Sequence, residues 1–156
     1  MLTLGRRFLV LVALMFWQGG FTFYAAVVVP LGQEVLQSHI EQGFITRRVT
    51  NYLNLTGAIT LVCLAWDIRA SRDAIGARRC VRWGAWLGMT VALVALVWLH
   101  PALDSLLEPE AKSVLDRAHF RSLHRLYLWL STLQWACAVV YSMLTLAAWR
   151  AADRSS

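Results

Sequence analysis

The chain has 156 residues, of which 58% are hydrophobic and 15% are charged, and its mean hydropathy is +0.53. Soluble domains usually carry about a quarter charged residues, so this composition excludes an ordinary soluble protein and predicts a single integral membrane domain. The net charge of +6 comes from 15 basic and 9 acidic residues, but no basic helix stands apart from the hydrophobic segments, so we expect no nucleic-acid binding.

The first long apolar segment is residues 8–31, which contain no charged side chain. A helix of that length would be roughly 36 Å long, enough to cross a hydrocarbon core of about 30 Å. Arg6 and Arg7 precede the segment as they would in a signal peptide, but the apolar run is too long and no small-residue cleavage site ends it. We therefore expect an uncleaved membrane-spanning helix that stops at Pro30.

A pair of glycines, Gly19 and Gly20, lies in the middle of this first span, and Thr22 and Ala26 continue a stripe of small residues at helical spacing. Because glycine has no side chain, another helix can approach the backbone closely there. We expect a helix-packing face; the alternative is a substrate or cofactor pressed against the bare backbone.

Residues 32–48 are polar, but Leu36, Ile40 and Phe44 recur every four residues among them. Such an amphipathic pattern predicts a short helix that lies at the membrane interface between the first and second spans.

The second span is expected at residues 49–66, between Arg48 and Asp67. A charge at the bilayer centre costs about 2.5–3.5 kcal/mol, so we expect these charged side chains to mark its ends. The amides of Asn51 and Asn54, near its start, should face other helices and not lipid.

The third span is expected at residues 83–99, after an arginine-rich connection over 69–82, and we expect His100 and Pro101 to close it. Gly84 and Gly88 are four residues apart near its start, which predicts a second close-packing face.

The fourth span is expected at residues 126–149, preceded by a mostly helical outer connection over 102–125. Small and polar side chains recur three or four residues apart along one face of this region. They are His124, Tyr127, Ser131, Gln134, Ala138, Ser142 and Thr145.

His124 is at the top of this stripe. It could be a ligand, a proton-transfer group or a gate at the mouth of a polar path that Tyr127, Ser131, Gln134, Asn51 and Asn54 would line. The alternative is a histidine that only hydrogen-bonds to a backbone carbonyl or an acidic side chain. Tyr127 would equally suit an aromatic anchor at the membrane interface.

The charge distribution predicts the topology. The N-terminus, the 69–82 connection and the tail hold nine arginines, whereas the other two connections hold six basic residues balanced by six acidic ones. By the positive-inside rule both termini should be cytoplasmic. The expected fold is thus an all-α integral membrane four-helix bundle, residues 1–156 forming one transmembrane domain, and its compactness and arginine-rich style favour a bacterial inner membrane.

The predicted topology places all four histidines on the outer side, where imidazole could bind zinc, copper or iron. The spacing of the histidines matches no tight metal motif. The spacing of the cysteines matches no zinc or redox motif, and their odd number argues against a disulfide framework. There is no nucleophile motif, phosphate loop or dinucleotide fingerprint, and no predicted span contains a charge, so we expect neither an enzyme nor an ion-coupled carrier.

Several short motifs occur in a suggestive order: Trp17-Gln18-Gly19-Gly20-Phe21 leading to Val29-Pro30, then Ile45-Thr46-Arg47-Arg48, Trp98-Leu99-His100-Pro101 and Phe120-Arg121-Ser122-Leu123-His124. In them the chain resembles the small four-helix membrane proteins of the domain-of-unknown-function group that includes transmembrane protein 205. The resemblance implies a four-helix membrane bundle with His124 at a family position.

That group is distantly similar to copper-resistance and haem-associated membrane proteins, which carry a histidine in the first helix ahead of the glycine pair. Residues 8–16 of this chain are wholly apolar, so that ligand is missing. Our leading hypothesis is a non-enzymatic membrane protein without a cofactor that assembles, as a homo-oligomer or with a membrane partner, through its glycine faces and handles a small solute or assists that partner. The alternative is an outer-facing metal or haem binder that uses His124 with His100 or His39.

Overall fold

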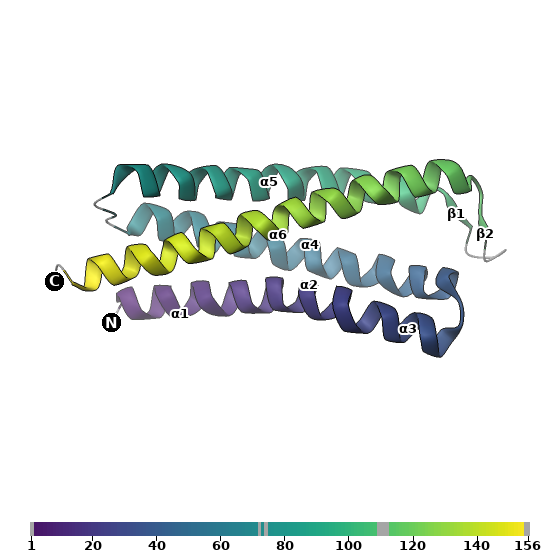
Figure 1. Ribbon diagram of the computed structural model, residues 1–156, viewed down its shortest axis with the longest axis horizontal. Helices are drawn as coiled ribbons and strands as arrows, with labels where there is room; N and C mark the ends of the chain where they lie inside the picture. The colour runs from purple at the N-terminus through teal and green to yellow at the C-terminus, as the bar shows by residue number, and fades with distance from the viewer. Residues whose placement is uncertain (1, 72, 74, 109–112, 155–156) are drawn as a thin grey trace.

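The computed structural model describes residues 2–71, 73, 75–108 and 113–154, and these are almost entirely helical. Four long helical segments run side by side (Figure 1), and each is long and apolar enough to cross a membrane. They are Leu2–Leu36, His39–Ala70, Gly76–Asp104 and Arg117–Asp153. The all-α prediction is therefore confirmed, and every predicted span lies within one of these helices.

The first helical segment is continuous but not uniform. It consists of α1 (Leu2–Leu14), a π-helical turn (Met15–Gly19), α2 (Gly20–Phe23), a second π-helical turn (Tyr24–Val28) and α3 (Val29–Leu36). The expectation that Pro30 stops the helix is wrong. Pro30 is the second residue of α3, directly after a π-helical turn, where the regular hydrogen-bond ladder is already interrupted and a missing N–H costs little.

The chain reverses at Gln37, which has a left-handed backbone with φ of 48°, and at Ser38. The Ser38 hydroxyl accepts a hydrogen bond from the Glu41 N–H at 3.3 Å and caps α4 (His39–Ala70). The prediction of a separate interfacial helix within residues 32–48 is therefore wrong. Its apolar repeat continues across this break, so its first residues belong to α3 and the rest to α4.

Helix α5 (Gly76–Asp104) continues through Pro101 instead of ending there. The short strands β1 (Leu107–Glu108) and β2 (Ser113–Val114) then pair as an antiparallel hairpin that the sequence did not predict. Helix α6 (Arg117–Asp153) follows, and the Asp116 carboxylate caps it by accepting hydrogen bonds from the N–H groups of Ala118 and His119. The predicted helical connection thus exists only in part.

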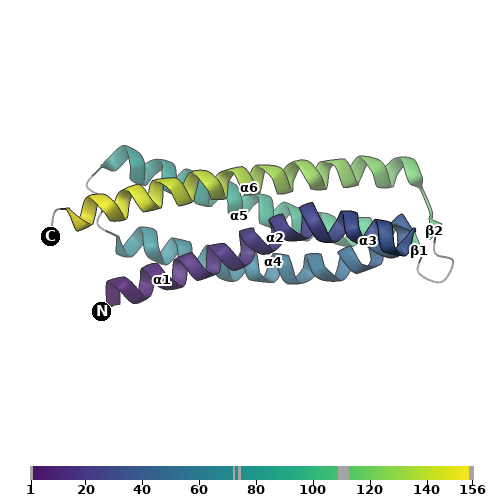
Figure 2. The ribbon, with the colours of Figure 1, turned by 60° about the horizontal axis from the view of Figure 1, so that its bottom comes forward.

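The helices pack in sequence order, with the first segment on α4, α4 on α5, and α5 on α6. Both chain ends and the connection between α4 and α5 lie at one end of the molecule, which we call the terminal end (Figures 1 and 2). The hairpin and the turn at residues 37–38 lie at the other end, which we call the hairpin end.

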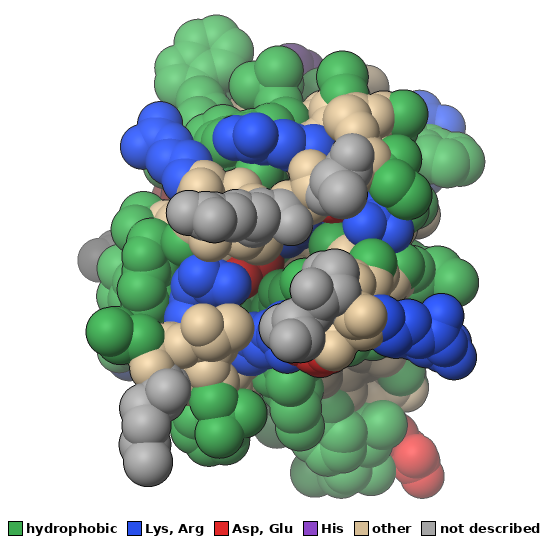
Figure 3. Space-filling model, turned by 90° about the vertical axis from the view of Figure 1, so that its left-hand side faces the viewer, with side chains coloured by type: hydrophobic (Ala, Val, Ile, Leu, Met, Phe, Trp, Pro, Cys, Tyr) green, Lys and Arg blue, Asp and Glu red, His purple; other side chains and the backbone are tan. Residues whose placement is uncertain are grey.

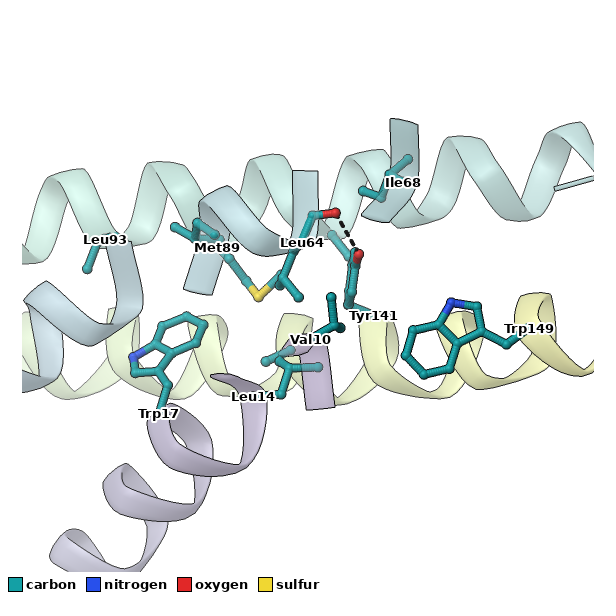
Figure 4. Close-up of a cluster of buried hydrophobic side chains, with 12 residues drawn as sticks. Val10, Leu14, Trp17, Leu64, Ile68, Met89, Leu93, Tyr141 and Trp149 are labelled. Carbon is teal, nitrogen blue, oxygen red and sulfur yellow. Dashed lines mark hydrogen bonds between the residues drawn. The ribbon is translucent and has the colours of Figure 1, made fainter. Parts of the chain in front are cut away.

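An apolar core fills the middle of the bundle (Figure 4). In it the hydroxyl of Tyr141 donates a hydrogen bond to the carbonyl of Leu64 at 3.0 Å. The other buried side chains include Val10, Leu14, Trp17, Leu61, Ile68, Met89, Leu93 and Trp149. Outside this core, large apolar side chains such as Phe8, Val91 and Trp129 are exposed, as expected for helices that face lipid.

Three glycines receive side chains from a neighbouring helix, and at Gly32 of α3 a Cβ atom would overlap the side-chain amide of Gln42 of α4. A Cβ atom at Gly57 of α4 would lie only 2.8 Å from Nε1 of Trp17, and one at Gly88 of α5 would lie 3.1 Å from Sγ of Cys137. Gly20 has Leu53 at an ordinary contact distance of 3.9 Å.

At Gly19 and Gly84, apart from the chain neighbours and the backbone of the same helix, no described atom lies within 4 Å of the Cβ position. Within one chain, close packing therefore involves Gly32, Gly57 and Gly88, and neither Gly32 nor Gly57 was among the predicted packing residues. A packing role for Gly19 and Gly84 against a second chain stays a prediction.

We expect Gly57→Ala to lower the free energy of unfolding by about 1–3 kcal/mol, because the new methyl group would overlap the buried indole of Trp17. Gly84→Ala makes the same chemical change in open helix and should leave stability unchanged or slightly higher. Unfolding of the purified protein in mild detergent measures both. Equal stability of the two variants would contradict this packing.

Candidate functional site

Two oppositely charged side chains are fully buried at the terminal end. Asp67 lies near the end of α4 and Arg82 lies in the second turn of α5, and neither side chain has any exposed surface. Nη2 of Arg82 donates to Oδ2 of Asp67 at 2.7 Å. The two helices therefore meet through an ion pair and not through apolar contact at this level.

The other polar atoms of this pair are also satisfied. Nε of Arg6 donates to Oδ1 of Asp67 at 2.9 Å, and Nε1 of Trp149 donates to Oδ2 at 3.3 Å. The Arg82 guanidinium donates to the hydroxyls of Thr145 and Ser71, both at 3.1 Å, and lies 5.5 Å from the centre of the Tyr141 ring. All four long helical segments thus contribute to one buried ion cluster.

Such a cluster stabilises the fold only because it is complete. Removing two charges from water costs several kcal/mol for each ion, and their attraction offsets that cost when the geometry is good and the remaining donors and acceptors are paired. Loss of one member leaves a buried charge without a partner. The cluster therefore specifies which faces of the helices meet.

A second layer of ion pairs surrounds the buried cluster. Arg78 forms a forked contact with Asp73, with Nη2 2.6 Å from Oδ1 and Nε 2.9 Å from Oδ2. Arg7 pairs with Asp153 at 2.8 Å, near the last turn of α6. The hydrogen bond from Arg78 lowers the pKa of Asp73 below its ordinary value of 3.8, although burial acts in the opposite direction.

A cavity of about 270 Å³ lies beside the cluster. Its lining includes Thr3, Arg6, Arg7, Ser71, Asp73 and Trp149. Figure 3 looks onto the terminal end, where arginine side chains surround small areas of acidic surface.

The sequence interpretation treated Asp67 only as a charge at the end of the second span and Arg82 only as one arginine of the 69–82 connection. The structure corrects this, because the helices continue through both residues and bury them. The sequence did contain a signal for this pairing. Asp67 is negatively charged and Arg6 and Arg82 are positively charged, and the predicted topology places all three on the same side of the membrane, each at the end of a different span. Their pairing could have been proposed from that placement.

The predicted polar path is brought together only in part. The hydroxyl of Tyr127 lies in hydrogen-bonding range of the side chains of Asn54 and Thr50, which joins α6 to α4. Further along α6, Nε2 of Gln134 donates to the Met89 carbonyl at 3.2 Å, and Ser131 donates to the Tyr127 carbonyl of its own helix.

The remaining members of that path lie apart from it. His124 is exposed and its ring stacks on Phe120 with centres 5.8 Å apart, and Asn51 is exposed on α4. Leu64 and Met89 are buried between the helices, on the side toward the terminal end. In the part of the chain that the structure describes, the polar groups are therefore separate contacts between helices. Their role as a gate or path stays a prediction.

The three histidines proposed as metal ligands do not form a cluster. His39 and His124 are exposed, and His100 is mostly buried with its Nε2 3.6 Å from Oδ2 of Asp104, which in turn pairs with Arg47 at 2.9 Å. Among the described residues there is no group of three or more His, Cys, Asp or Glu side chains that could hold a metal ion. The geometry therefore does not favour the metal or haem alternative, which stays a prediction.

A second concave feature is a lateral groove of about 510 Å³ between the first helical segment and α4. Its lining includes Met15, Phe16, Gly19, Gly20, Tyr52 and Leu53. This lateral groove is largely apolar and opens to the side of the bundle, whereas the cavity of the terminal end is charged.

Comparison of the chain with protein-family models, with curated proteins and with solved structures finds no match. The resemblance to the group that includes transmembrane protein 205 therefore stays a prediction. The functional argument rests on the residues of this chain.

We expect Asp67→Asn to lower the free energy of unfolding by about 3–5 kcal/mol, because the nearly isosteric amide removes the carboxylate 2.7 Å from the buried Arg82 and leaves only that of Asp73, 3.9 Å away. Asp153→Asn is the matched control, since Asp153 is exposed and its pairing with Arg7 is screened by solvent. Thermal unfolding in detergent compares the two. A comparable loss in both variants would show that burial of the pair is unimportant.

Stability should also fall in acid through Asp73. Its pKa is lowered in the folded protein, so the stabilisation is complete above pH 3.8 and is lost as the pH falls below that value through the folded-state pKa. The difference in unfolding free energy between wild type and Asp73→Asn should therefore shrink on acidification below pH 3.8. A difference that does not change with pH over this range would refute the assignment.

Proposed function

We propose that the protein is a non-enzymatic, polytopic membrane protein that assembles laterally with a second copy of itself. The contact surface is the lateral groove at Gly19 and Gly20. In this proposal both chain ends are cytoplasmic and the protein lies in a bacterial inner membrane, as the arginine distribution favours.

The observation that supports assembly is the open backbone at Gly19. Apart from its two chain neighbours and the backbone of its own helix, no described atom lies within 4 Å of its Cβ position, although the residue lies in the middle of an apolar span. Small residues in membrane helices favour close approach of a second helix, because packing and not the hydrophobic effect drives association in lipid. An unfilled glycine face therefore favours an intermolecular contact.

The same face also carries the groups that could fill the lateral groove of a partner. Phe16 and Tyr52 line the groove and are both 71% exposed. A surface with a bare strip and protruding aromatic rings side by side can match its own copy across a two-fold axis, with the rings of each chain entering the groove of the other. This self-complementarity supports a homodimer as the occupant.

Passage of a solute through the bundle has less support. The buried charges at the terminal end are paired with one another, and the apolar core lies between that end and the contact of Tyr127 with Asn54. A polar route would need all these side chains to separate. The assembly role needs no such rearrangement.

We expect Gly19→Leu to weaken self-association at least tenfold, equivalent to about 1.4 kcal/mol, because the leucine would occupy the lateral groove that the partner enters. Gly84→Leu is the matched control, since it makes the same change at an open glycine of α5 outside that groove. Analytical ultracentrifugation in mild detergent and energy transfer between labelled chains in vesicles measure the oligomer.

Wild type and Gly84→Leu should be dimeric where Gly19→Leu is monomeric. A monomeric wild type, or the same association constant in all three proteins, would contradict the proposal. Gly88→Leu is unsuitable as a test of assembly, because Cys137 of the same chain already occupies the space beside Gly88.

A further inference from the structure

The ion pairs of the terminal end leave an excess of positive charge. Among the described residues, four arginines and three carboxylates pair with one another there. They are Arg6, Arg7, Arg78 and Arg82 with Asp67, Asp73 and Asp153. Asp67 serves both Arg6 and Arg82, so the cluster has one more guanidinium than carboxylates. An additional anion would balance the charge of this partly buried group.

One donor of the cluster is also left over. Both Nη1 and Nη2 of Arg7 pair with the Asp153 carboxylate, Nη2 also donates to the Trp149 carbonyl at 3.5 Å, and the guanidinium lies 5.4 Å from the centre of the Trp149 ring. Its Nε is buried and has no hydrogen-bond partner among the described residues. Buried donors are normally paired, so the unpaired Nε indicates an acceptor that the chain itself does not supply.

The cavity beside this arginine has suitable size and chemistry. Its volume of about 270 Å³ is several times the roughly 30 Å³ that one water molecule occupies in the liquid, so it has room for a tetrahedral oxyanion. Arg6 and Arg7 line one side, and the hydroxyl-bearing residues Thr3 and Ser71 also contribute. Guanidinium groups bind phosphate oxygens through paired, charge-assisted hydrogen bonds.

The surroundings would bring anions to this cavity. Exposed arginines lie at the same end of the molecule: Arg69, Arg79, Arg150 and Arg154. In the proposed topology this end meets the cytoplasmic surface of the membrane, where anionic headgroups gather and each nearby arginine adds attraction.

We propose that the cavity of the terminal end is a binding site for a phosphate group, carried either by an anionic lipid headgroup or by a free phosphate. Arg7 and Arg6 supply the charge, and the Nε of Arg7 gains the acceptor that it lacks. The site is separate from the lateral groove, so it stands or falls independently of self-association.

The test measures binding to the full chain in two arms. In mild detergent, radiolabelled inorganic phosphate is titrated at constant ionic strength with chloride as the competitor. In the other arm the protein is placed in nanodiscs of phosphatidylcholine with or without phosphatidic acid, and bound lipid is quantified after purification. Stabilisation against heat is recorded in both arms.

Arg7→Gln removes one guanidinium from the lining, and Arg79→Gln makes the same change at an exposed arginine of the same end that does not line the cavity. We expect at least tenfold weaker binding in Arg7→Gln and a much smaller loss in Arg79→Gln, because Arg79 adds only long-range attraction and does not line the cavity. Ala70→Leu, which adds bulk to the cavity lining without changing the charge, should also weaken binding and decides the matter if Arg7→Gln does not fold.

Binding in the first arm identifies a free phosphate, and binding only in the second identifies a lipid headgroup. Three results would overturn the proposal: no binding in either arm, equal stabilisation by chloride, or wild-type affinity in a folded Arg7→Gln or Ala70→Leu variant.

Discussion

The fold depends on the buried pair of Asp67 and Arg82. Apolar side chains alone specify helix contacts weakly in lipid, because a leucine is as favourable against an acyl chain as against another helix. A buried charge, in contrast, has very few acceptable positions. By engaging Arg6, Thr145 and Trp149, the pair ties the first helical segment, α4, α5 and α6 together at one level and sets how they face one another.

The first helical segment and α4 pack less closely toward the hairpin end. The change occurs at Trp17. Its indole lies against the bare backbone of Gly57 and fills the space between the first helical segment and α4. Beyond it, Gly19 and Gly20 have no side chains to fill the same space, so the lateral groove opens there. A π-helical turn over Met15–Gly19 lies at this point, and such turns often mark places where a helix adapts to a binding role.

The two concave features of the molecule thus differ in origin and in chemistry. The lateral groove exists because glycine leaves space in an apolar wall, and it suits packing by large side chains from within the bilayer. The cavity of the terminal end is lined by arginines and polar side chains, which is the chemistry that we propose for anion binding. Their separation along the bundle allows one chain to combine lateral assembly with recognition of a charged group.

The sequence by itself determined the number and approximate position of the spanning helices, because long apolar runs bounded by charges have few alternatives in a chain of this composition. It also indicated that the amides of Asn51 and Asn54 face other helices; Asn54 is partly buried, whereas Asn51 is exposed. It did not show that Pro30 and Pro101 lie inside helices, since that depends on how neighbouring turns accommodate a missing N–H. Only the tertiary structure decided that Asp67 and Arg82 are buried partners and that Gly57 is closely packed whereas Gly84 is not. Those outcomes depend on the rotation of each helix about its own axis, which contacts between helices set and local sequence does not.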